Sequence, residues 1–462
     1  MATVLAIEAT SIDVSVANPE ELQPEGSGRP NILMIVTDDQ RADALGYMPA
    51  TKRLFRQGGT TYTEAYSTTP LCCPARASIM TGRYVHNHGV LRNEDAAALD
   101  HDTTLQGYLQ NAGYQTALAG KFLNSWPIDQ DPLFFDRWSM YYPRGPYTQG
   151  YVRDGIHSYN NALFNEDGTL RLIYRYATDY IGERARNFLR TFEEADEIPW
   201  MLYVAPFAPH SPATPAPRHR DDRIRQWRGN PATRETDRTD KPLWVQQKDS
   251  PARRSLRFRR RQLRSLKAVD EIIDELFDEM RTLDETRTTL AFFLSDNGYL
   301  WGEHRLSAKR HPYLPSAQIP LMARWPMHLA PGAQDDRLVA NIDLLPTILD
   351  AVGIAASSAE PPDGRSLFAS GARDRVLLEY FTDGGAIPSW ASTLTTSSQY
   401  VEYYEDDIPI FREYYDLIED SWQLTNLMGD ADPTNDPFPI TAAEMSLQLR
   451  DDRSCRGPEA CP

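Results

Sequence analysis

Continuous apolar runs that end in polar residues recur along the chain. The first covers residues 31–37 (NILMIVT), and its β-branched residues without alternation are typical of a strand buried on both faces of a parallel sheet. Three more runs follow the same pattern at residues 115–119, 200–205 and 289–295. The sequence therefore predicts four buried strands, each with polar side chains at its carboxyl end.

Helical periodicity lies between these runs. It is clearest over residues 262–283, where apolar residues recur at spacings of three and four. These residues are Leu263, Leu266, Val269, Ile273, Leu276, Met280 and Leu283. Alternating strands and helices predict an α/β fold with a mostly parallel central sheet flanked by helices. In open sheets of this type ligands bind beyond the carboxyl ends of the strands, so the polar residues there are candidates for one common site.

The pattern changes in the last fifth of the chain. Short aromatic-rich runs at 376–381 and 400–404 alternate with Gly, Asp and Pro, and predict antiparallel strands. A late helix is expected over 441–449. Earlier in the chain, residues 217–249 are polar and lack periodicity, which indicates a long surface excursion.

The length of 462 residues allows two or three domains. We expect an N-terminal extension over residues 1–28 and a catalytic α/β domain over residues 29–374. A small C-terminal α+β domain with an antiparallel sheet is expected over residues 375–462.

Charge and hydropathy exclude several classes of protein. With 48 basic and 65 acidic side chains the net charge is −17, which argues against a nucleic-acid-binding protein, because such proteins present positive charge to phosphates. No apolar run reaches the roughly 18–20 residues of a membrane span. The first 22 residues lack a basic region and Glu8 interrupts their apolar run, so no clear signal peptide is predicted.

The four cysteines form two close pairs. Cys72 and Cys73 precede Pro74, a residue typical of the first turn of a helix, where unpaired N–H groups and the helix dipole favour an anion. Cysteine counting alone leaves a vicinal thiol pair or disulfides in three connectivities open. Cys455 and Cys461 lie in a tail containing Gly and Pro, so a local disulfide is a further option and would indicate an oxidising compartment.

The string Cys72-x-Pro74-x-Arg76, followed by TGR at 81–83, resembles the signature of the sulfatase family. The resemblance extends from residues 30–32 through 343–347 and reaches 415–417. In that family the first cysteine of the motif is oxidised to formylglycine by a modification enzyme. A hydrated aldehyde at Cys72 would carry two hydroxyl groups: one attacks sulfur and displaces the alcohol, and the other drives elimination of sulfate.

The resemblance also implies a metal site. Asp38 and Asp39 follow the first predicted strand, and Asp296 and Asn297 follow the last. Such hard oxygen ligands suit Ca²⁺, with Mg²⁺ as a second possibility. In sulfatases the matching residues hold the cation together with the formylglycine oxygen at the position of Cys72.

Basic residues near the other strand ends match the catalytic residues of the family. Lys121 and Lys309 correspond to lysines that grip the sulfate oxygens, and Arg76 to an arginine that holds the formylglycine. His210, between two prolines, corresponds to the histidine that protonates or binds the leaving oxygen. An isolated lysine, arginine or histidine is more often plain polar surface, and only the motif context favours the catalytic interpretation.

One position departs from many sulfatases. The histidine expected two residues after Lys121 is absent, because the chain reads Lys121-Phe122-Leu123-Asn124. This string resembles the glucosamine-6-sulfatase and extracellular heparan sulfatase branch, as does YVHNH at 84–88. Asn124 is therefore the candidate for a substrate contact in place of that histidine.

A cluster of basic residues stands out against the acidic background. It consists of Arg253, Arg254, Arg257, Arg259, Arg260, Arg261, Arg264 and Lys267. We favour the interpretation that this is a solvated helix start balanced by the acidic residues of 270–279. The alternative is that the cluster steers an anionic polysaccharide into the site.

The leading hypothesis is hydrolysis of sulfate monoesters, on a sulfated sugar or an aryl sulfate. The alternatives are a phosphonate monoester or phosphodiester hydrolase with the same site, and a catalytically silent glycan-binding homologue in which Cys72 stays unmodified. We expect a sulfated small molecule or glycan and the formylglycine-generating enzyme as partners, and neither nucleic acid nor a membrane span. Secretion or a periplasmic location is favoured, with the cytoplasm as the alternative.

Overall fold

The computed structural model describes residues 28–142, 159–195, 197–250, 252–429, 434 and 439–462. Within these residues, ten strands form one sheet in the order β12-β2-β11-β8-β1-β7-β3-β4-β5-β6. The strands are β1 (Asn31–Thr37), β2 (Thr60–Tyr66), β3 (Gln115–Lys121), β4 (Arg137–Tyr142), β5 (Asn160–Glu166), β6 (Thr169–Tyr176), β7 (Trp200–Ala205), β8 (Thr289–Ser295), β11 (Leu321–Arg324) and β12 (Ala333–Ala340). The four strands expected from the apolar runs are β8, β1, β7 and β3, which are neighbours in the middle of the sheet.

The centre of the sheet is parallel, as predicted. Strand β1 pairs in parallel with β7 and β8, and β3 pairs in parallel with β7 and β4. Antiparallel pairing is found at β11 and across β4, β5 and β6. Because neighbouring parallel strands end at the same edge, their following residues meet beyond it.

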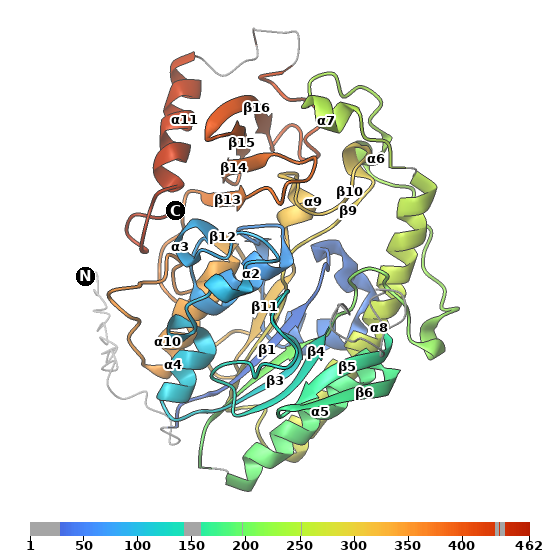
Figure 1. The fold of residues 1–462 in the computed structure, drawn as a ribbon, viewed down its shortest axis with the longest axis vertical. Helices are drawn as coiled ribbons and strands as arrows, with labels where there is room; N and C mark the ends of the chain where they lie inside the picture. Colours follow the sequence, from blue (N-terminus) through green and yellow to red (C-terminus); the bar gives the residue numbers. More distant parts are fainter. Residues whose placement is uncertain (1–27, 143–158, 196, 251, 430–433, 435–438) are drawn as a thin grey trace, which may run out of the picture.

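Helices cover both faces of the sheet (Figure 1). Residues Ile32, Met34 and Val36 of β1 join a core with α2, α4 and α10 on one face, whereas Leu33 and Ile35 join a core with α5 and α8 on the other. This division follows from the alternation of side chains along a strand. The helices are α1 (Pro49–Thr51), α2 (Cys72–Thr81), α3 (Val85–His88), α4 (Leu105–Asn111), α5 (Ala177–Phe192), α6 (Pro231–Arg234), α7 (Leu243–Gln246), α8 (Ala252–Thr282), α9 (Leu314–Ala317), α10 (Leu344–Val352) and α11 (Pro439–Asp452).

Helix α8 is longer than the sequence predicts. It begins at Ala252, ten residues before the expected start, and ends at Thr282. The inward face of its first turns carries Ser255, Arg259 and Gln262, which are buried although they are polar. The Arg259 guanidinium packs on the rings of both Trp227 and Trp301, at 5.1 and 5.0 Å from their centroids. Because these inward residues are polar, apolar periodicity does not predict this part of the helix.

None of the helices in the described part of the chain combines the length and apolarity needed to cross a membrane.

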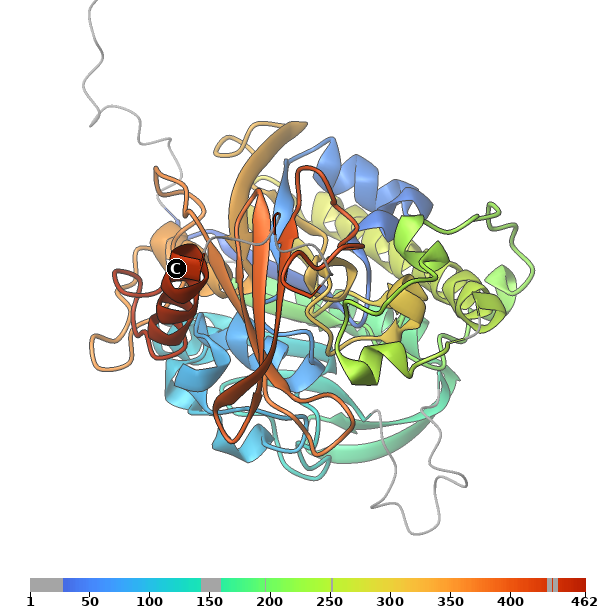
Figure 2. The ribbon, with the colours of Figure 1, turned by 90° about the horizontal axis from the view of Figure 1, so that it is seen from above.

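The C-terminal part contains a separate antiparallel sheet, as expected. Its strands are β13 (Val376–Tyr380), β14 (Ser389–Leu394), β15 (Ser398–Glu405) and β16 (Ile408–Asp416), in that order. Figure 2 shows α11 on one side of this sheet and the 217–250 segment, which contains the short helices α6 and α7, on the other. A two-stranded ribbon of β9 (Leu300–Trp301) and β10 (Ser307–Ala308) precedes it. The expected N-terminal extension lies outside the described residues except for Gly28.

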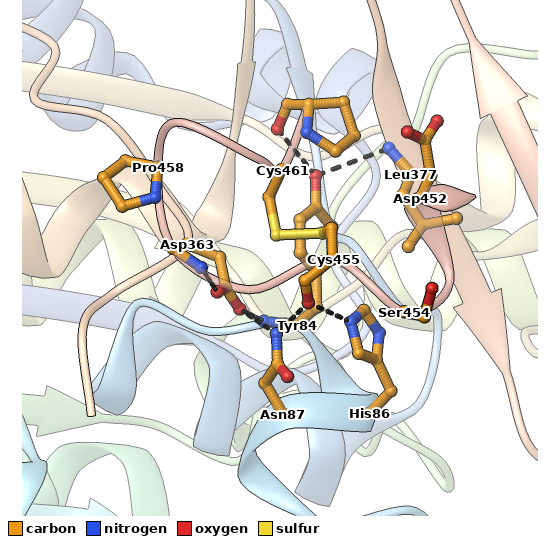
Figure 3. The surroundings of a disulfide bond; sticks show 12 residues. Tyr84, His86, Asn87, Asp363, Leu377, Asp452, Ser454, Cys455, Pro458 and Cys461 are labelled. Carbon is orange, nitrogen blue, oxygen red and sulfur yellow. Dashed lines mark hydrogen bonds between the residues drawn. A yellow bond between two sulfur atoms is a disulfide. The ribbon is translucent and has the colours of Figure 1, made fainter. Parts of the chain in front are cut away.

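A disulfide joins Cys455 to Cys461 and fastens the C-terminal tail to the segment around α3 (Figure 3). The Cys455 carbonyl accepts a hydrogen bond from Asn87 Nδ2 at 2.8 Å and lies 3.0 Å from His86 Nε2. Tyr84 Oη donates to the Pro462 carbonyl at 3.0 Å. Of the connectivities open to four cysteines, only this bridge forms, and Cys72 and Cys73 are free thiols.

Candidate active site

Three carboxylates and an amide meet beyond β1 and β8. These strands pair in register to their last residues, so Asp38 and Asp39 leave β1 beside Asp296 and Asn297 leaving β8. The Asp39 amide donates to Asp296 Oδ1 at 3.1 Å, and Asn297 Nδ2 donates to Asp39 Oδ1 at 2.8 Å. Asp39 adopts a positive φ of 67°, which turns the chain sharply at this point. The predicted metal ligands are thus brought together.

Cys72 is the first residue of α2 and faces the same carboxylates. Its Sγ lies 3.2 Å from Asp38 Oδ1. Ligand atoms of Asp38, Asp39, Cys72 and Asp296 all lie within 4.8 Å of one another, and all four residues are buried. A cluster of this size and oxygen content can surround a single divalent cation.

The side chain of Asn297 provides an independent test of this fit. Its Oδ1 atom is buried and has no hydrogen-bond partner among the described residues. A buried amide oxygen without a partner costs free energy unless another group meets it, and an amide oxygen is a common ligand for Ca²⁺. The residues present therefore fit a hard divalent cation.

Three basic side chains compensate the buried negative charge. Lys121 Nζ, from the end of β3, lies 2.6 Å from Asp38 Oδ2. Lys309 Nζ contacts both Asp39 Oδ1 and Cys72 Sγ. Each of these lysines thus reaches the carboxylate cluster from a different loop or strand end.

Arg76 is the third basic group and is fully buried. Its Nε donates to Asp296 Oδ2 at 2.9 Å, and its Nη1 donates to the Lys121 carbonyl at 3.1 Å. One helical turn separates it from Cys72, so α2 delivers both side chains to the same cluster. Arg76 connects the helix to two strand ends.

Burial shifts the ionisation of the central groups. It raises the pKa of the Cys72 thiol, and the carboxylates of Asp296 and Asp38 raise that pKa further. The unmodified side chain is therefore a protonated thiol and a weak nucleophile. Burial also raises the pKa of Asp38, but Lys121 and the other nearby cations outweigh this effect and hold it well below its usual range. Asp38 is a permanent carboxylate at neutral pH.

His210 lies on a loop that follows β7. Its Nε2 is 3.8 Å from Asp39 Oδ2, and its Nδ1 is 2.7 Å from the Ser211 carbonyl. Tyr159 Oη donates to the His210 carbonyl at 2.7 Å, and the Phe207 ring packs against the imidazole. Burial lowers the pKa of His210 below its usual range. The imidazole is therefore neutral at neutral pH, and its position is fixed by these contacts.

A pocket of about 420 Å³ opens above these residues. Asp39, His210 and Lys309 line it together with Tyr380 and Asp383. Tyr380 is the last residue of β13, and Asp383 follows that strand, so the C-terminal part of the chain contributes to the pocket. Asp383 also pairs with Arg310, at 2.7 Å. Tyr380 and Asp383 could not be predicted from the sequence, because no recognisable motif surrounds them and they lie far in sequence from the ends of the central strands.

Asn124, the candidate substrate contact, has no hydrogen bond to the carboxylate cluster in the described part of the chain. Its carbonyl accepts a hydrogen bond from Cys73 Sγ at 3.5 Å, and its buried Oδ1 has no partner among the described residues. The substrate role of Asn124 stays a prediction. His304, which follows the short ribbon strand β9, lies 2.8 Å from Glu235 and does not face the cluster.

An α/β sheet that gathers carboxylates, lysines and a buried cysteine at one edge defines a hydrolase for anionic esters. The chain belongs to the sulfatase family: residues 30–354 match the family described as Sulfatase. Residues 302–449 match the family described as N-sulphoglucosamine sulphohydrolase, C-terminal. The protein is accordingly a sulfuric ester hydrolase, and family membership together with the ligand cluster indicates a metal ion.

Individual relatives agree with this assignment. A Homo sapiens protein named N-acetylglucosamine-6-sulfatase is 30% identical, over 94% of this chain and 86% of the relative. A solved structure described as a complex with D-glucosamine-2-N,6-O-disulfate has a TM-score of 0.79 at 23% identity, over 92% of this chain and 98% of the other. A phosphonate monoester hydrolase from Silicibacter pomeroyi has a TM-score of 0.69 at 23% identity, covering 91% and 94%. The two structural likenesses establish the fold.

Proposed function

We propose that this sulfatase removes the 6-O-sulfate of a glucosamine residue, with formylglycine formed at Cys72 as the nucleophile. The observation that carries the proposal is the convergence of Cys72, two lysines and three carboxylates below a pocket of about 420 Å³. A pocket of this size can enclose one sugar residue. The name of the human relative supports the choice of substrate, since identity extends over nearly the whole chain.

In this proposal the basic residues bind the sulfate group. Lys121 contacts Asp38 and Lys309 contacts Asp39, so their ammonium groups would hold sulfate oxygens next to the nucleophile. Fixed positive charges of this kind stabilise negative charge that accumulates on the sulfuryl oxygens in the transition state. Arg76, with no exposure to solvent, holds Asp296 in place.

Asp38, Asp39, Asp296 and Asn297 would hold the cation, which we propose to be Ca²⁺, with Mg²⁺ as the alternative. A cation bound there would polarise the sulfate and support ionisation of the attacking hydroxyl. His210 lies at the pocket wall beside Asp39 and would interact with the leaving oxygen of the sugar.

The nucleophile in this proposal is one hydroxyl of the hydrated aldehyde. It attacks sulfur and gives up its proton, the bond from sulfur to the sugar oxygen breaks, and that oxygen takes up a proton as the alcohol leaves. Loss of the proton from the second hydroxyl then expels sulfate and restores the aldehyde, and addition of water regenerates the hydrate. The raised pKa of the Cys72 thiol favours this route over a direct thiolate attack, because the unmodified side chain stays protonated.

We also place the protein in an oxidising compartment, outside the cytoplasm. The support is the buried disulfide between Cys455 and Cys461, next to which Asn87 of α3 donates a hydrogen bond to the Cys455 carbonyl. Disulfides of this kind persist in secreted and periplasmic proteins and are rare in the cytosol. A formylglycine-generating enzyme would be an obligatory partner in the same export route.

Parallel assays test the substrate. We expect a higher kcat/KM for N-acetylglucosamine-6-sulfate than for an aryl sulfate, and little turnover of an aryl phosphonate. A much larger kcat/KM for the phosphonate would overturn the proposal in favour of a phosphonate monoester hydrolase. Mass spectrometry of the peptide across Cys72 tests the nucleophile, because formylglycine is about 18 Da lighter than cysteine. An active preparation that contains only unmodified Cys72 would refute the mechanism.

A further inference from the structure

A second pocket, of about 350 Å³, adjoins the candidate active site. It shares Ser211, Tyr299 and two further serines, Ser250 and Ser307, with the pocket above the carboxylate cluster. The ring of Tyr299 stacks on that of Phe258, with centroids 5.1 Å apart. The two pockets are therefore neighbours, and the stacked rings of Tyr299 and Phe258 lie along their common side.

Three arginines of α8 line this second pocket: Arg254, Arg257 and Arg261. Their spacing of three and four places them on one face of the helix, over a length of about 10 Å. Four serines complete the polar lining, and no carboxylate is among the described residues that form it. The surface is thus positive at a point where the rest of the protein is strongly acidic.

The three arginines have no acidic partner among the described residues, so their charges are free to meet an anion. Further along α8, Lys267 pairs with Asp222. The acidic residues on the later turns are used elsewhere, in the pairs Glu271–Arg218, Asp274–Arg53, Glu275–Arg186 and Glu279–Arg190. The basic start of this helix is solvated, as favoured above, but no ion pair joins it to the acidic residues of 270–279 in the described part of the chain.

We infer that Arg254, Arg257 and Arg261 form a second anion subsite, which binds a sulfate or carboxylate group on a sugar adjoining the one in the active site. Guanidinium groups suit this task because each can donate two parallel hydrogen bonds to an anionic group and holds its charge at every physiological pH. The inference deepens the proposed function and rests on it: the substrate is the end of a sulfated polysaccharide rather than a free monosaccharide.

A matched pair of triple variants tests the subsite. In the first, Arg254→Gln, Arg257→Gln and Arg261→Gln remove the three charges from the pocket. In the second, Arg56→Gln, Arg253→Gln and Arg260→Gln remove three exposed charges that do not line it. Both are assayed with N-acetylglucosamine-6-sulfate and with a heparin-derived tetrasaccharide that carries a 6-sulfated glucosamine at its non-reducing end.

We expect the first variant to lose about tenfold in kcat/KM on the tetrasaccharide, because three solvent-accessible ion pairs are lost, and to keep its activity on the monosaccharide. The tetrasaccharide preference of the wild type should weaken with added salt, and that of the variant should not. The control should behave as the wild type. Equal losses on both substrates, or no loss on the tetrasaccharide, would overturn the subsite.

Elution from immobilised heparin separates this inference from the proposed function, because it requires no turnover. The first variant should elute at lower salt than the wild type and the control. If the wild type cleaved no glucosamine sulfate but showed this difference in elution, the proposed substrate would be wrong and the anion subsite would stand. Identical elution of all three proteins would contradict the proposed anion subsite, whatever the activity of the wild type.

Discussion

Arg76 Nε donates a hydrogen bond to Asp296 Oδ2 at 2.9 Å, although the two residues are 220 positions apart in sequence. Both side chains are fully shielded from solvent. The pair connects helix α2, which carries the candidate nucleophile, to the end of β8, which carries half of the candidate metal ligands. This buried ion pair therefore helps to fix the distance between Cys72 and the candidate metal ligands.

Replacement of Arg76 by Ala should destabilise the protein by about 3–5 kcal/mol, because it leaves the carboxylate of Asp296 buried without its partner. Urea unfolding followed by tryptophan fluorescence measures this change. Arg76→Lys keeps the charge but cannot donate to both Asp296 and the Lys121 carbonyl. It should lose less stability than Arg76→Ala while still losing activity. An Ala variant as stable as the wild type would show that the pair has no structural role.

Replacement of Lys309 by Ala should lower kcat by about 10²–10³-fold, as expected for the loss of one fixed charge at the reacting group. Lys248 provides a matched control, since it lines the same pocket but is exposed to solvent. Lys248→Ala should change kcat little. Circular dichroism of both variants in the presence of Ca²⁺ checks that the fold is intact. Similar kcat values for the two variants would exclude the proposed role of Lys309.

Addition of Ca²⁺ should raise the Tm of protein that has been treated with a chelator, and should restore its activity. At 100 times the dissociation constant, the stabilisation expected for a single site is about 2.7 kcal/mol. Asn297→Ala removes an oxygen that has no other partner among the described residues, so it should reduce the Tm response. A parallel titration with Mg²⁺ identifies the preferred cation. An Asn297→Ala variant with the full response would place the ion elsewhere.

The contact between His86 and Glu379 should make stability depend on pH. Burial lowers the pKa of His86, but the Glu379 carboxylate, 3.1 Å away, outweighs it and raises the pKa above the ordinary value of 6.5. A histidine whose pKa is higher in the folded state stabilises the fold fully below pH 6.5, and the contribution disappears as the pH rises through the folded pKa.

The variant His86→Gln should therefore have a lower Tm than the wild type at pH 6, and the difference should shrink at pH 9. Scanning fluorimetry across this range measures it. His328→Gln is the control, because His328 is exposed, stacks on Trp325 and has no acidic partner in the described part of the chain. A Tm difference for His86→Gln that is constant with pH would mean that the histidine acts through packing alone.

The centre of the fold could be predicted from sequence because it is encoded by local composition. Strands β1, β7 and β8 are uninterrupted apolar runs, and such runs are stable only where both faces of a sheet are covered. Strand β6, in contrast, exposes most of its residues and has no such signature. The start of α8 was missed because its inward residues, such as Gln262, are polar.

The candidate site could also be predicted only in part: the residues at the strand ends could be found from the sequence, and those from the C-terminal part of the chain could not. Residues at or just after the ends of the central strands, such as Lys121 and Asp38, were found because parallel strands deliver their ends to one place. Asp383 could not be found in this way, since it reaches the pocket from a different sheet through tertiary packing. The sequence also could not show that Arg257 lacks an acidic partner, because only the folded structure shows which acidic residues pair with other arginines.

The burial of Cys72 determines when it can be modified. In the folded protein this residue is 1% exposed, and it is in contact with Lys309, which lies 237 positions later in the chain. An enzyme that oxidises the side chain has no access to it once β8 and the Lys309 loop have reached their places. The proposed oxidation must therefore happen while the chain is still extended, during synthesis or transport. Under the proposed mechanism, a molecule that folded before it met the oxidising enzyme would keep its thiol and would stay inactive.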